Sequence, residues 1–450
     1  MAITFRIQDF LYPFSLVRLH RFLDKSQYFD TETMAVYQNR RLRTIIKQAV
    51  TFVPFYRDAF ARLRLTADDI RTVQDLKKLP VLSKDMLKQS PAAFLAENNR
   101  RFSPRACTTS GSSGEPMVLY HDKAAAILEF CHYWRYWGWG GYRLGMPFAD
   151  FSLAHFSNMA QEMIADFSRI TRRLTLNPAF LSDTTIARYT AALEQHGIRF
   201  LKGSPSTLYV FAHLIRKHGL ACPPVRCIFT TGELLLPYQR TYLAETFGTR
   251  IIDSYGLMER TAAITQCEHG TYHIHAEYGI IEIEKDEKLS SNHLTAGTLI
   301  STALHNYVMP LIRYRIPDII EYETDPAVCP CGRTLPVIKK IHGRQQDALI
   351  TPSGRIITNL FIIPEDVPGI ALFRIVQKTP DAITVTITPS LAYTDETPRH
   401  LTAALNRILH NEMRIDVTVE EDMPPPQTYK QKTVTSSVYQ EYLAQNREGR

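Results

Sequence analysis

The pattern of apolar and polar positions divides the chain into a helix-rich beginning, an alternating middle and a β-rich later part. Apolar residues at helical spacing over Met34–Phe60, interrupted at Pro54, predict two helices. Farther along, Arg199–Leu201, Arg226–Thr230 and Arg250–Ser254 have the length and composition of short strands, with a helix-length segment between one and the next. This alternation predicts parallel strands joined by helical crossovers.

Capping residues mark where two of these helices begin. Asp183 is predicted to cap a helix that ends at Gly197. Ser204 and Pro205 have the residue types of an N-cap and a first turn, so they predict the start of the next helix. In parallel sheets ligands bind beyond the carboxyl ends of strands, so the loops 231–233 and 255–259 are candidate binding loops.

The chain is predicted to form two domains with a boundary near Gly343. Residues 1–343 form a large N-terminal domain with βαβ units and a β-rich subdomain, which begins near Tyr272. Residues 344–450 form a small α+β domain. Its predicted elements are strands Ala371–Gln377 and Ile383–Thr388, a helix Pro398–Met413, a strand Asp416–Glu420, and a loop and tail from Met423 onward.

Composition excludes several classes of protein. With 450 residues, 45% hydrophobic and 22% charged, the chain is neither disordered nor fibrous. The net charge of +7 comes without a basic stripe, so nucleic acid is not an expected partner. No apolar run reaches the roughly 18–20 residues that cross a bilayer, and no secretory signal is recognisable, so we predict a cytoplasmic protein without a transmembrane segment. The segment Phe10–Leu23 could lie on a membrane surface, and packing on its own domain is the alternative that we favour.

The most distinctive local motif is rich in hydroxyls and glycine. Its residues are Thr108, Thr109, Ser110, Gly111, Ser112, Ser113 and Gly114, followed by Glu115 and Pro116. Glycines let the backbone approach a ligand closely, and hydroxyls with free amides can surround an anion such as a triphosphate. No Gly-Lys-Ser/Thr follows, so this is not a Walker-type loop. Taken alone, a flexible surface turn is an equally good interpretation.

Together with three later motifs, this loop resembles the adenylate-forming superfamily of acyl-CoA synthetases and adenylation domains. The later motifs are Tyr255-Gly256-Leu257-Met258-Glu259, Arg313-Tyr314-Arg315-Ile316-Pro317-Asp318 and Gly343-Arg344-Gln345-Gln346-Asp347. The branch that the chain resembles is that of the phenylacetate-CoA ligases and their capsule-biosynthesis relatives. Further similar motifs are Val53–Arg57, Leu79–Lys84, Met309–Tyr314 and Cys329–Arg333, and the resemblance runs from about residue 35 to residue 440.

The resemblance implies a role for each matching residue. Thr108 to Gly114 would hold the phosphates of ATP, and Gly232 with Glu233 would line the adenine pocket. Tyr255, followed by Gly256, would stack on adenine, and Glu259 would bind Mg²⁺, for which a carboxylate is a suitable hard ligand. The remaining matches are Asp318 on the ribose hydroxyls, Arg344 in the interdomain motif, and Lys430, in a mobile small domain, as the catalytic lysine.

Three positions depart from the family pattern. Pro317 precedes Asp318 and removes an amide donor. Gln346 stands where the family commonly has an aspartate at the interdomain hinge, so the domain rotation could be tuned differently here. Tyr429 replaces the glycine that usually precedes the catalytic lysine, with Lys432 at the following basic position.

The resemblance implies ATP-dependent activation of a carboxylic acid to an acyl-adenylate, release of pyrophosphate and transfer of the acyl group to coenzyme A. Transfer to an amine or to a carrier-protein thiol is an alternative, and a catalytically silent nucleotide-binding scaffold is another. All three tryptophans fall within His132–Trp139, which suits either an aromatic acid or ordinary core packing. A homodimer is a candidate oligomeric state.

The seven cysteines fall into two groups. Cys107, Cys131, Cys222 and Cys227 lie in or beside apolar stretches and are interpreted as small buried residues. Cys329 and Cys331 lie on a tight turn, and Cys267 and His273 could come alongside them. Three thiolates and one imidazole form a normal structural zinc set. His269 or His275 could replace His273, and free thiols in a turn are the alternative to a metal.

Overall fold

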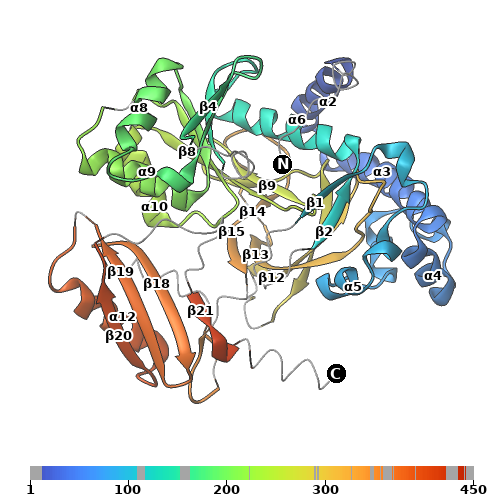
Figure 1. Cartoon of the computed structure of the whole chain (residues 1–450). Coiled ribbons are helices and arrows are strands. Elements are labelled where there is room, and N and C mark those ends of the chain that lie inside the picture. The colour runs from blue at the N-terminus through green and yellow to red at the C-terminus, as the bar shows by residue number, and fades with distance from the viewer. Residues whose placement is uncertain are drawn as a thin grey trace.

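The structure is a computed structural model, and it has a large part and a small C-terminal part (Figure 1). It describes residues 13–108, 117–152, 163–221, 223–287, 290, 293–325, 327–344, 349–354, 356–357, 367, 369–390, 392–421, 434–439 and 441.

Helices dominate the first hundred residues, as predicted. They are α2 (Pro13–Ser26), α3 (Thr31–Phe52), α4 (Pro54–Leu63) and α5 (Lys84–Gln89), followed or interrupted by 3₁₀ turns at Ala67–Asp69, Val73–Lys78, Pro91–Phe94 and Asn99–Phe102. Asp30 caps α3 by accepting a hydrogen bond from the amide of Thr33. Pro54 is the first residue of α4, where its missing amide costs nothing, and this explains the break in the helical pattern.

A nine-stranded sheet forms the centre of the large part. Its strands, in spatial order, are β14 (Val337–Ile338), β10 (Tyr272–Ile274), β9 (Ala263–Gln266), β8 (Arg250–Gly256), β7 (Cys227–Thr231), β6 (Phe200–Gly203), β3 (Phe148–Phe151), β5 (Arg173–Leu176) and β4 (Ala165–Ser168). The five strands from β8 to β5 are parallel, which confirms the predicted crossovers.

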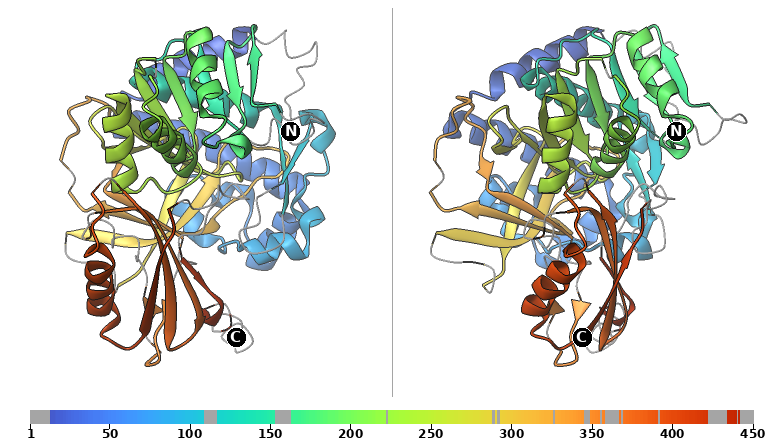
Figure 2. Two further views of the ribbon diagram at one scale, coloured as in Figure 1. Left: turned by 60° about the vertical axis from the view of Figure 1, so that its left-hand side comes forward. Right: turned by 90° about the vertical axis from the view of Figure 1, so that its left-hand side faces the viewer.

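Helices cover both faces of this sheet (Figures 1 and 2). The alternate strand residues Ala149, Leu201 and Ile228 pack in one core with α8 (Ile186–Gln195), α9 (Pro205–Lys217) and α10 (Pro237–Phe247). Their neighbours on the other face, Phe200 and Phe229 among them, pack against α6 (Lys123–Trp139). Both faces are therefore buried, as is usual for a parallel sheet.

One of the two predicted helix caps is confirmed and the other is wrong. Ser204 accepts a hydrogen bond from the amide of Thr207 at the start of α9. Asp183 does not cap α8, whose N-cap residue is Thr185. The Asp183 carboxylate instead contacts Lys217 and His218 at the end of α9, at 3.1 and 2.7 Å. Contacts with two side chains of a later helix have replaced the local backbone contact.

Antiparallel strands form the β-rich region next to the main sheet. They are β11 (Gly279–Lys285), β12 (Leu294–Ala303), β13 (Tyr314–Glu323) and β15 (Lys340–Arg344), in that spatial order, and a separate hairpin joins β1 (Arg105–Thr108) to β2 (Val118–His121).

The register between β12 and β13 shifts at one point. Leu299 pairs with Ile316 while Thr298 pairs with Ile319, so Pro317 and Asp318 form a bulge with no partner on β12. A proline is tolerated at such a point because no ladder hydrogen bond needs its amide. Bulges also redirect side chains, which here concerns Asp318.

Helix α2 packs against α6 through Leu23, Leu128 and Cys131, which confirms the packing interpretation for the described part of the segment 10–23. A buried ion pair lies beneath it. Arg135 of α6 contacts Glu277 at 2.7 Å, and Glu277 also accepts a hydrogen bond from Ser26 at the end of α2. Among the described residues, no helix has both the length and the apolar character that a membrane crossing requires.

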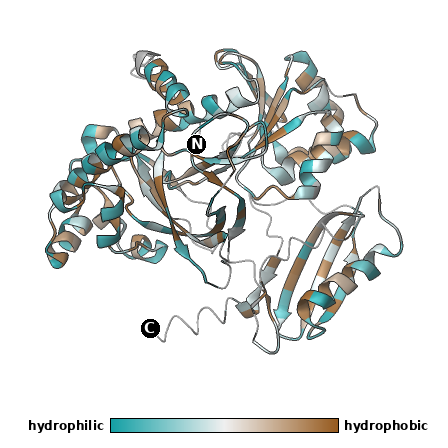
Figure 3. Cartoon of the chain, turned by 180° about the vertical axis from the view of Figure 1, so that it is seen from behind, coloured by the Kyte–Doolittle hydropathy of each residue, from teal (hydrophilic) through white to brown (hydrophobic). Residues whose placement is uncertain are grey.

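The small part has its own apolar core. Its elements are β16 (Leu349–Ile350), β17 (Ile356–Ile357), β18 (Ile370–Thr379), β19 (Ala382–Pro389), α12 (Thr397–Leu409), β20 (Arg414–Val419) and β21 (Val434–Ser436). The main sheet has the order β20-β19-β18-β21, with α12 on one face (Figure 2). Apolar residues concentrate in its strands and on the inner side of α12 (Figure 3).

Two predictions for the small part are corrected. Helix α12 ends at Leu409 rather than Met413, because His410 and Asn411 adopt positive φ angles that end a helix. The residues from Met423 onward are not all loop and tail, since Val434–Ser436 forms β21 and pairs in parallel with β18. Three residues are too few to give a strand pattern in the sequence.

A buried glutamine connects three strands of the small part. Gln377 of β18 accepts a hydrogen bond from the amide of Ile350 at 3.0 Å and donates one to its carbonyl at 2.5 Å. The hydroxyl of Ser436 donates to the same Gln377 oxygen at 2.6 Å. The side chain therefore ties β16 and β21 to β18.

Candidate active site

The two candidate loops lie where the sequence predicted them, at the carboxyl ends of β7 and β8. Gly232 directly follows β7 and has φ +89°, a conformation that only glycine adopts easily. The carboxylate of Glu233 accepts hydrogen bonds from the hydroxyl and the amide of Ser206, at 2.6 and 3.2 Å. Glu233 therefore fixes its loop to the first turn of α9.

Tyr255 and Asp318 meet at this edge although 63 residues separate them. The hydroxyl of Tyr255, at the end of β8, donates a hydrogen bond of 2.5 Å to the carboxylate of Asp318 in the β13 bulge. Asp318 is 5% exposed. Across the sheet, the backbone of Asp318 pairs with that of Arg344 in β15. Three residues from separate motifs are thus neighbours.

The loop that carries Glu259 is held from two sides. The hydroxyl of Tyr314 donates to Glu259 at 3.3 Å. The ring of His121 donates from Nε2 to the carbonyl of Met258 at 2.7 Å, and its Nδ1 faces the amide nitrogen of Asn306 at 3.3 Å. Burial and the charge of Arg260 lower the pKa of His121 to about 4, so the ring stays neutral.

His121 and the neighbouring Asp122 are residues that the sequence analysis missed. Asp122 caps α6 through the amide of Ala125 at 2.7 Å and accepts a second hydrogen bond from the amide of Tyr307, also at 2.7 Å. The available signal was their position at the end of β2, the strand that follows the hydroxyl-rich motif in the sequence: His121 is its last residue and Asp122 comes directly after it.

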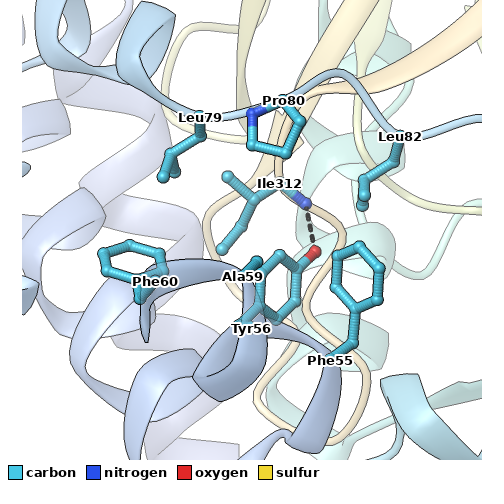
Figure 4. Close-up of a pocket in the computed structure, with 8 residues that line it drawn as sticks. All are labelled: Phe55, Tyr56, Ala59, Phe60, Leu79, Pro80, Leu82 and Ile312. Atoms are coloured by element: carbon cyan, nitrogen blue, oxygen red, sulfur yellow. Dashed lines mark hydrogen bonds between the residues drawn. The ribbon is translucent and has the colours of Figure 1, made fainter. Parts of the chain in front are cut away.

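Residues from two N-terminal motifs, Val53–Arg57 and Leu79–Lys84, contact the start of β13 and the segment before it. Leu82 exchanges backbone hydrogen bonds with Arg313 and Arg315, at 2.8 and 2.9 Å. The hydroxyl of Tyr56 donates to the carbonyl of Pro310 at 2.9 Å and accepts from the amide of Ile312 at 3.0 Å (Figure 4). These contacts fix the segment that leads to Asp318.

The cavity at this support is a packing gap rather than a ligand site. Its volume is about 10 Å³, close to the minimum for a single water. Its lining is almost wholly apolar (Figure 4): Phe55, Tyr56, Ala59, Phe60, Leu79, Pro80, Leu82 and Ile312.

Several predicted residues lie outside the described residues. These are Thr109, Ser110, Gly111, Ser112, Ser113 and Gly114 of the hydroxyl-rich motif, the hinge residue Gln346, and Lys430 with its neighbours. Thr108 ends β1 and Arg344 ends β15, with only their backbones described.

Comparison with known proteins gives consistent relatives. Protein CapK of Staphylococcus aureus is 21% identical over 327 residues, which are 72% of this chain and 70% of CapK. A phenylacetate-coenzyme A ligase of Thermus thermophilus is 24% identical over 353 residues, 75% of this chain and 77% of that enzyme. No family model matches the chain.

The fold matches that of a solved acyl-CoA ligase. A crystal structure of 2-hydroxyisobutyryl-CoA ligase in the post-adenylation state superimposes with a TM-score of 0.72 at 17% identity, covering 94% of both chains. The predicted resemblance to the phenylacetate-CoA ligase branch of the adenylate-forming superfamily is thus found in sequence over about three quarters of the chain, and the chain shares the fold of an acyl-CoA ligase. The predicted fold class and the enzyme class, an AMP-forming acid ligase, are confirmed.

In this ligase the tryptophan-rich segment is mainly core. Tyr136, Trp137 and Trp139 are at most 8% exposed. Trp137 stacks on Phe229 at 5.5 Å, and Trp139 stacks on His275 at 5.4 Å. Of the two interpretations of this segment, the structure favours core packing.

The three turn cysteines and one histidine come together beside this core. Cys267, His273, Cys329 and Cys331 place one ligand atom each within 4.8 Å of the others. The sulfurs of Cys267 and Cys329 are 3.6 Å apart, and Cys331 Sγ lies 3.4 Å from Nε2 of His273. A tetrahedral zinc ion with ordinary bond lengths needs ligand separations of about 3.5–3.8 Å.

The surroundings of the cluster also fit a metal. Nδ1 of His273 lies 3.3 Å from the carbonyl of Leu335, so the Nδ1–H donates outward and Nε2 is left to face the sulfurs. His269 donates its backbone amide to Cys267 Sγ at 3.4 Å, while His275 faces Arg135 and His132 instead. His273 is therefore the histidine of the set.

Proposed function

We propose that this ligase activates a carboxylic acid with ATP, releases pyrophosphate and transfers the acyl group from the adenylate to coenzyme A. The observation that carries the proposal is the 2.5 Å contact of Tyr255 with Asp318, because it unites two separate motifs at the carboxyl edge of the sheet. The relatives named for coenzyme A ligation favour coenzyme A over an amine or a carrier-protein thiol.

Each residue has a role in this proposal. Tyr255 stacks on adenine beside Gly232, Glu233 and Gly256, and Asp318 binds the ribose hydroxyls. Glu259 binds Mg²⁺, which together with Arg344 and Lys430 balances the charge that develops on the phosphates. Residues 108–114 hold those phosphates. Residues 1–343 and 344–450 are the proposed two domains, and the small one rotates between the half-reactions.

Exchange of labelled pyrophosphate into ATP tests the proposal. A panel of carboxylic acids is screened with and without coenzyme A, with hydroxylamine as the trap for activated acyl groups. Acid-dependent exchange with product formation that requires coenzyme A is the expected result. No exchange with any acid would indicate the silent scaffold, and product that depends on an added amine but not on coenzyme A would indicate an amide ligase.

The variant Glu259→Gln tests the magnesium role. The amide keeps the shape of the side chain and its contact with Tyr314 but removes the charge that a hard cation requires. Pyrophosphate exchange is expected to fall about 10²- to 10³-fold, on the scale of one electrostatic contact in a transition state. Exchange at the wild-type rate would rule out Glu259 as the magnesium ligand.

We also propose that Cys267, His273, Cys329 and Cys331 bind one structural zinc ion. The support is the donor set, its tetrahedral spacing and its burial, since the first three residues are at most 6% exposed. The ion would fasten the turn at 329–331 to the β9–β10 hairpin, and it would hold no position open for chemistry.

Metal analysis of protein purified without added metal tests this site. Zinc near one per chain is expected in the wild type, with loss of the metal and a lower melting temperature in Cys331→Ser. Cys227→Ser is the matched control, because Cys227 is a buried thiol outside the cluster, and it should keep its zinc. Wild-type protein without zinc would leave free thiols as the interpretation.

The cytoplasmic location, the homodimer and an aromatic acid as substrate stay predictions.

A further inference from the structure

An ion pair lies on the α6 side of the main sheet, near the ends of two central strands. Asp150 of β3 and Lys202 of β6 are register partners, with 3.1 Å between carboxylate and ammonium. Arg173 of β5 lies 4.0 Å from the other carboxylate oxygen. The side chain of Asp150 is 10% exposed and that of Lys202 is 21% exposed.

This pair departs from the pattern of its own sheet. Strands buried on both faces are normally apolar throughout, and the preceding residues on the same face, Phe148 and Phe200, follow that rule. Charges in such a position cost desolvation, and the ion pair only partly offsets the cost. Charged residues at positions that are normally apolar are expected at functional sites such as ligand-binding sites.

Position relates the pair to the proposed active site. Asp150 and Lys202 are each the next-to-last residue of their strand, at the carboxyl edge where such sheets bind ligands. Gly203 and Ser204 directly follow Lys202, in the turn that Glu233 fixes through Ser206. On the α6 side, the Lys202 ammonium lies 5.6 Å above the ring of Tyr133.

The chemistry of the pair selects for a neutral polar group. Asp150 is already paired with Lys202 and also faces Arg173, so no unbalanced carboxylate is left to bind a cationic group of a ligand. An ammonium can only donate and a carboxylate can only accept. A hydroxyl, which does both, complements the two together.

We propose that Asp150 and Lys202 determine specificity by binding a hydroxyl group on the carboxylic acid substrate. The inference rests on the proposed function and narrows its substrate to hydroxylated acids. Tyr133 and the turn at Gly203 would bound the same end of the acyl site.

Matched acids that differ by one hydroxyl test the proposal in the full-length protein. Suitable pairs are phenylacetate with its ring-hydroxylated forms, benzoate with the hydroxybenzoates, and butyrate with the hydroxybutyrates. For the best pair, kcat/KM in pyrophosphate exchange is expected to favour the hydroxylated acid about 10- to 100-fold, the range for a hydrogen bond to a charged group. In Asp150→Asn/Lys202→Met this ratio is expected to fall to near one.

The control removes an exposed ion pair of the same residue types elsewhere. Asp183 and Lys217 also lie 3.1 Å apart, on the outer surface of the same domain, and Asp183→Asn/Lys217→Met should leave the ratio unchanged. A ratio between two acids does not respond to a general loss of folded protein. If the double variant melts early, Lys202→Met alone replaces it, because Arg173 still faces Asp150.

The outcomes separate this inference from the function itself. No pyrophosphate exchange with any acid would reject both the proposed function and the proposed role of Asp150 and Lys202. Exchange in the wild type without preference for the hydroxylated partner in any pair overturns only the role of Asp150 and Lys202. A preference that survives in the double variant overturns it as well.

Discussion

At the scale of single residues, Tyr255 makes two contacts in the proposed function, one through its ring and one through its hydroxyl. In the proposed function its ring stacks on adenine while its hydroxyl orients the Asp318 carboxylate toward the ribose. Asp318 stands on a bulge, where the backbone has fewer fixed partners than in a regular strand. The hydrogen bond from Tyr255 therefore supplies part of the orientation.

Tyr255→Phe should raise the KM for ATP about 10-fold, because a hydrogen bond to a charged group contributes about 1.5–3 kcal/mol and the stacking ring remains. Steady-state pyrophosphate exchange at varied ATP measures this. Tyr272→Phe is the matched control, since its hydroxyl donates to the buried carboxylate of Asp253 at 2.7 Å. Equal effects of both variants on the KM would contradict a specific role for Tyr255.

Lys430→Ala should slow adenylation about 10²- to 10³-fold, because a flexible ammonium can bridge the carboxylate and an ATP phosphate in the transition state. Transfer from a preformed acyl-adenylate should change much less, since the small domain has rotated by then. Single-turnover measurements of the two half-reactions separate the effects. An equal loss of rate in both half-reactions would contradict the role proposed for Lys430. A larger adenylation defect in Lys432→Ala would show that Lys432 is the catalytic lysine instead.

Buried neutral histidines make stability depend on pH. His305 accepts from Arg41 at Nδ1, at 2.7 Å, and donates from Nε2 to the carbonyl of Glu277, at 2.8 Å. Burial, with the charge of Arg41, lowers its pKa to about 3. The unfolded chain takes up this proton near pH 6.5 and the folded chain does not. Stability is thus complete above about pH 6.5 and falls as the pH drops toward 3.

At pH 5 this histidine should lower the free energy of unfolding by about 2 kcal/mol relative to its value at pH 7.5. The figure follows from about 1.4 kcal/mol for each pH unit below 6.5. Denaturant unfolding at several pH values measures the slope. The variant His305→Gln should reduce the dependence of stability on pH. His400 is exposed, so His400→Gln should leave that dependence unchanged. An unchanged slope in His305→Gln would contradict the assignment.

Motifs identified some of the site residues and missed others for a physical reason. Tyr255, Glu259 and Asp318 lie in short sequence motifs that resemble those of a known family, so the sequence alone identifies them as candidates. His121 acts through one backbone carbonyl, and a lone histidine after an apolar strand has the same pattern as an ordinary buried one. The contact of Asp150 with Lys202 depends on strand register, which spacing alone does not give.

At the scale of elements, two glycines have opposite surroundings. A Cβ on Gly279, at the start of β11, would overlap the backbone carbonyl of Thr261, just after the Glu259 loop. A Cβ on Gly138, inside α6, would meet nothing within 4 Å. The first glycine is required by close packing and the second is not.

Gly279→Ala should therefore lower stability by roughly 1–3 kcal/mol or more, because backbone must move to admit the methyl group. Gly138→Ala should raise it by up to about 1 kcal/mol through helix propensity. Denaturant unfolding of both variants measures the difference. A stable Gly279→Ala protein would mean that β11 and the Thr261 segment can separate without cost.

The periodic pattern was a good guide to long elements and a poor one to short elements. Strands β6, β7 and β8 lie within a few residues of their predicted bounds, whereas the short parallel strands β3 and β5 were not predicted. Strand β21 has three residues, too few for a pattern, and Asp183 pairs with Lys217 of α9, which is distant in sequence. Local signals fail where a tertiary contact outweighs them.

At the scale of the whole molecule, buried polar contacts join segments that no local signal connects. Ser26 and Arg135 both contact Glu277, across 251 and 142 residues. Removing one member would leave a charge buried without its partner, which typically costs 3–5 kcal/mol. The described N-terminal helix is thereby fixed to α6 and to the core beside the central sheet.

The amide of Gln377 has a mechanical consequence for the two-part molecule. Arg344 is still paired with Asp318 in the large part, while Ile350 is already bonded to Gln377 in the small one. In the proposed function the small part turns on the large one, so Ile350 would turn together with Gln377. Ser436 is held by the same amide, on the strand that begins four residues after Lys430. Strands β16 and β21 are thus joined to β18 through one side chain, so in the proposed rotation these three strands would move as one unit.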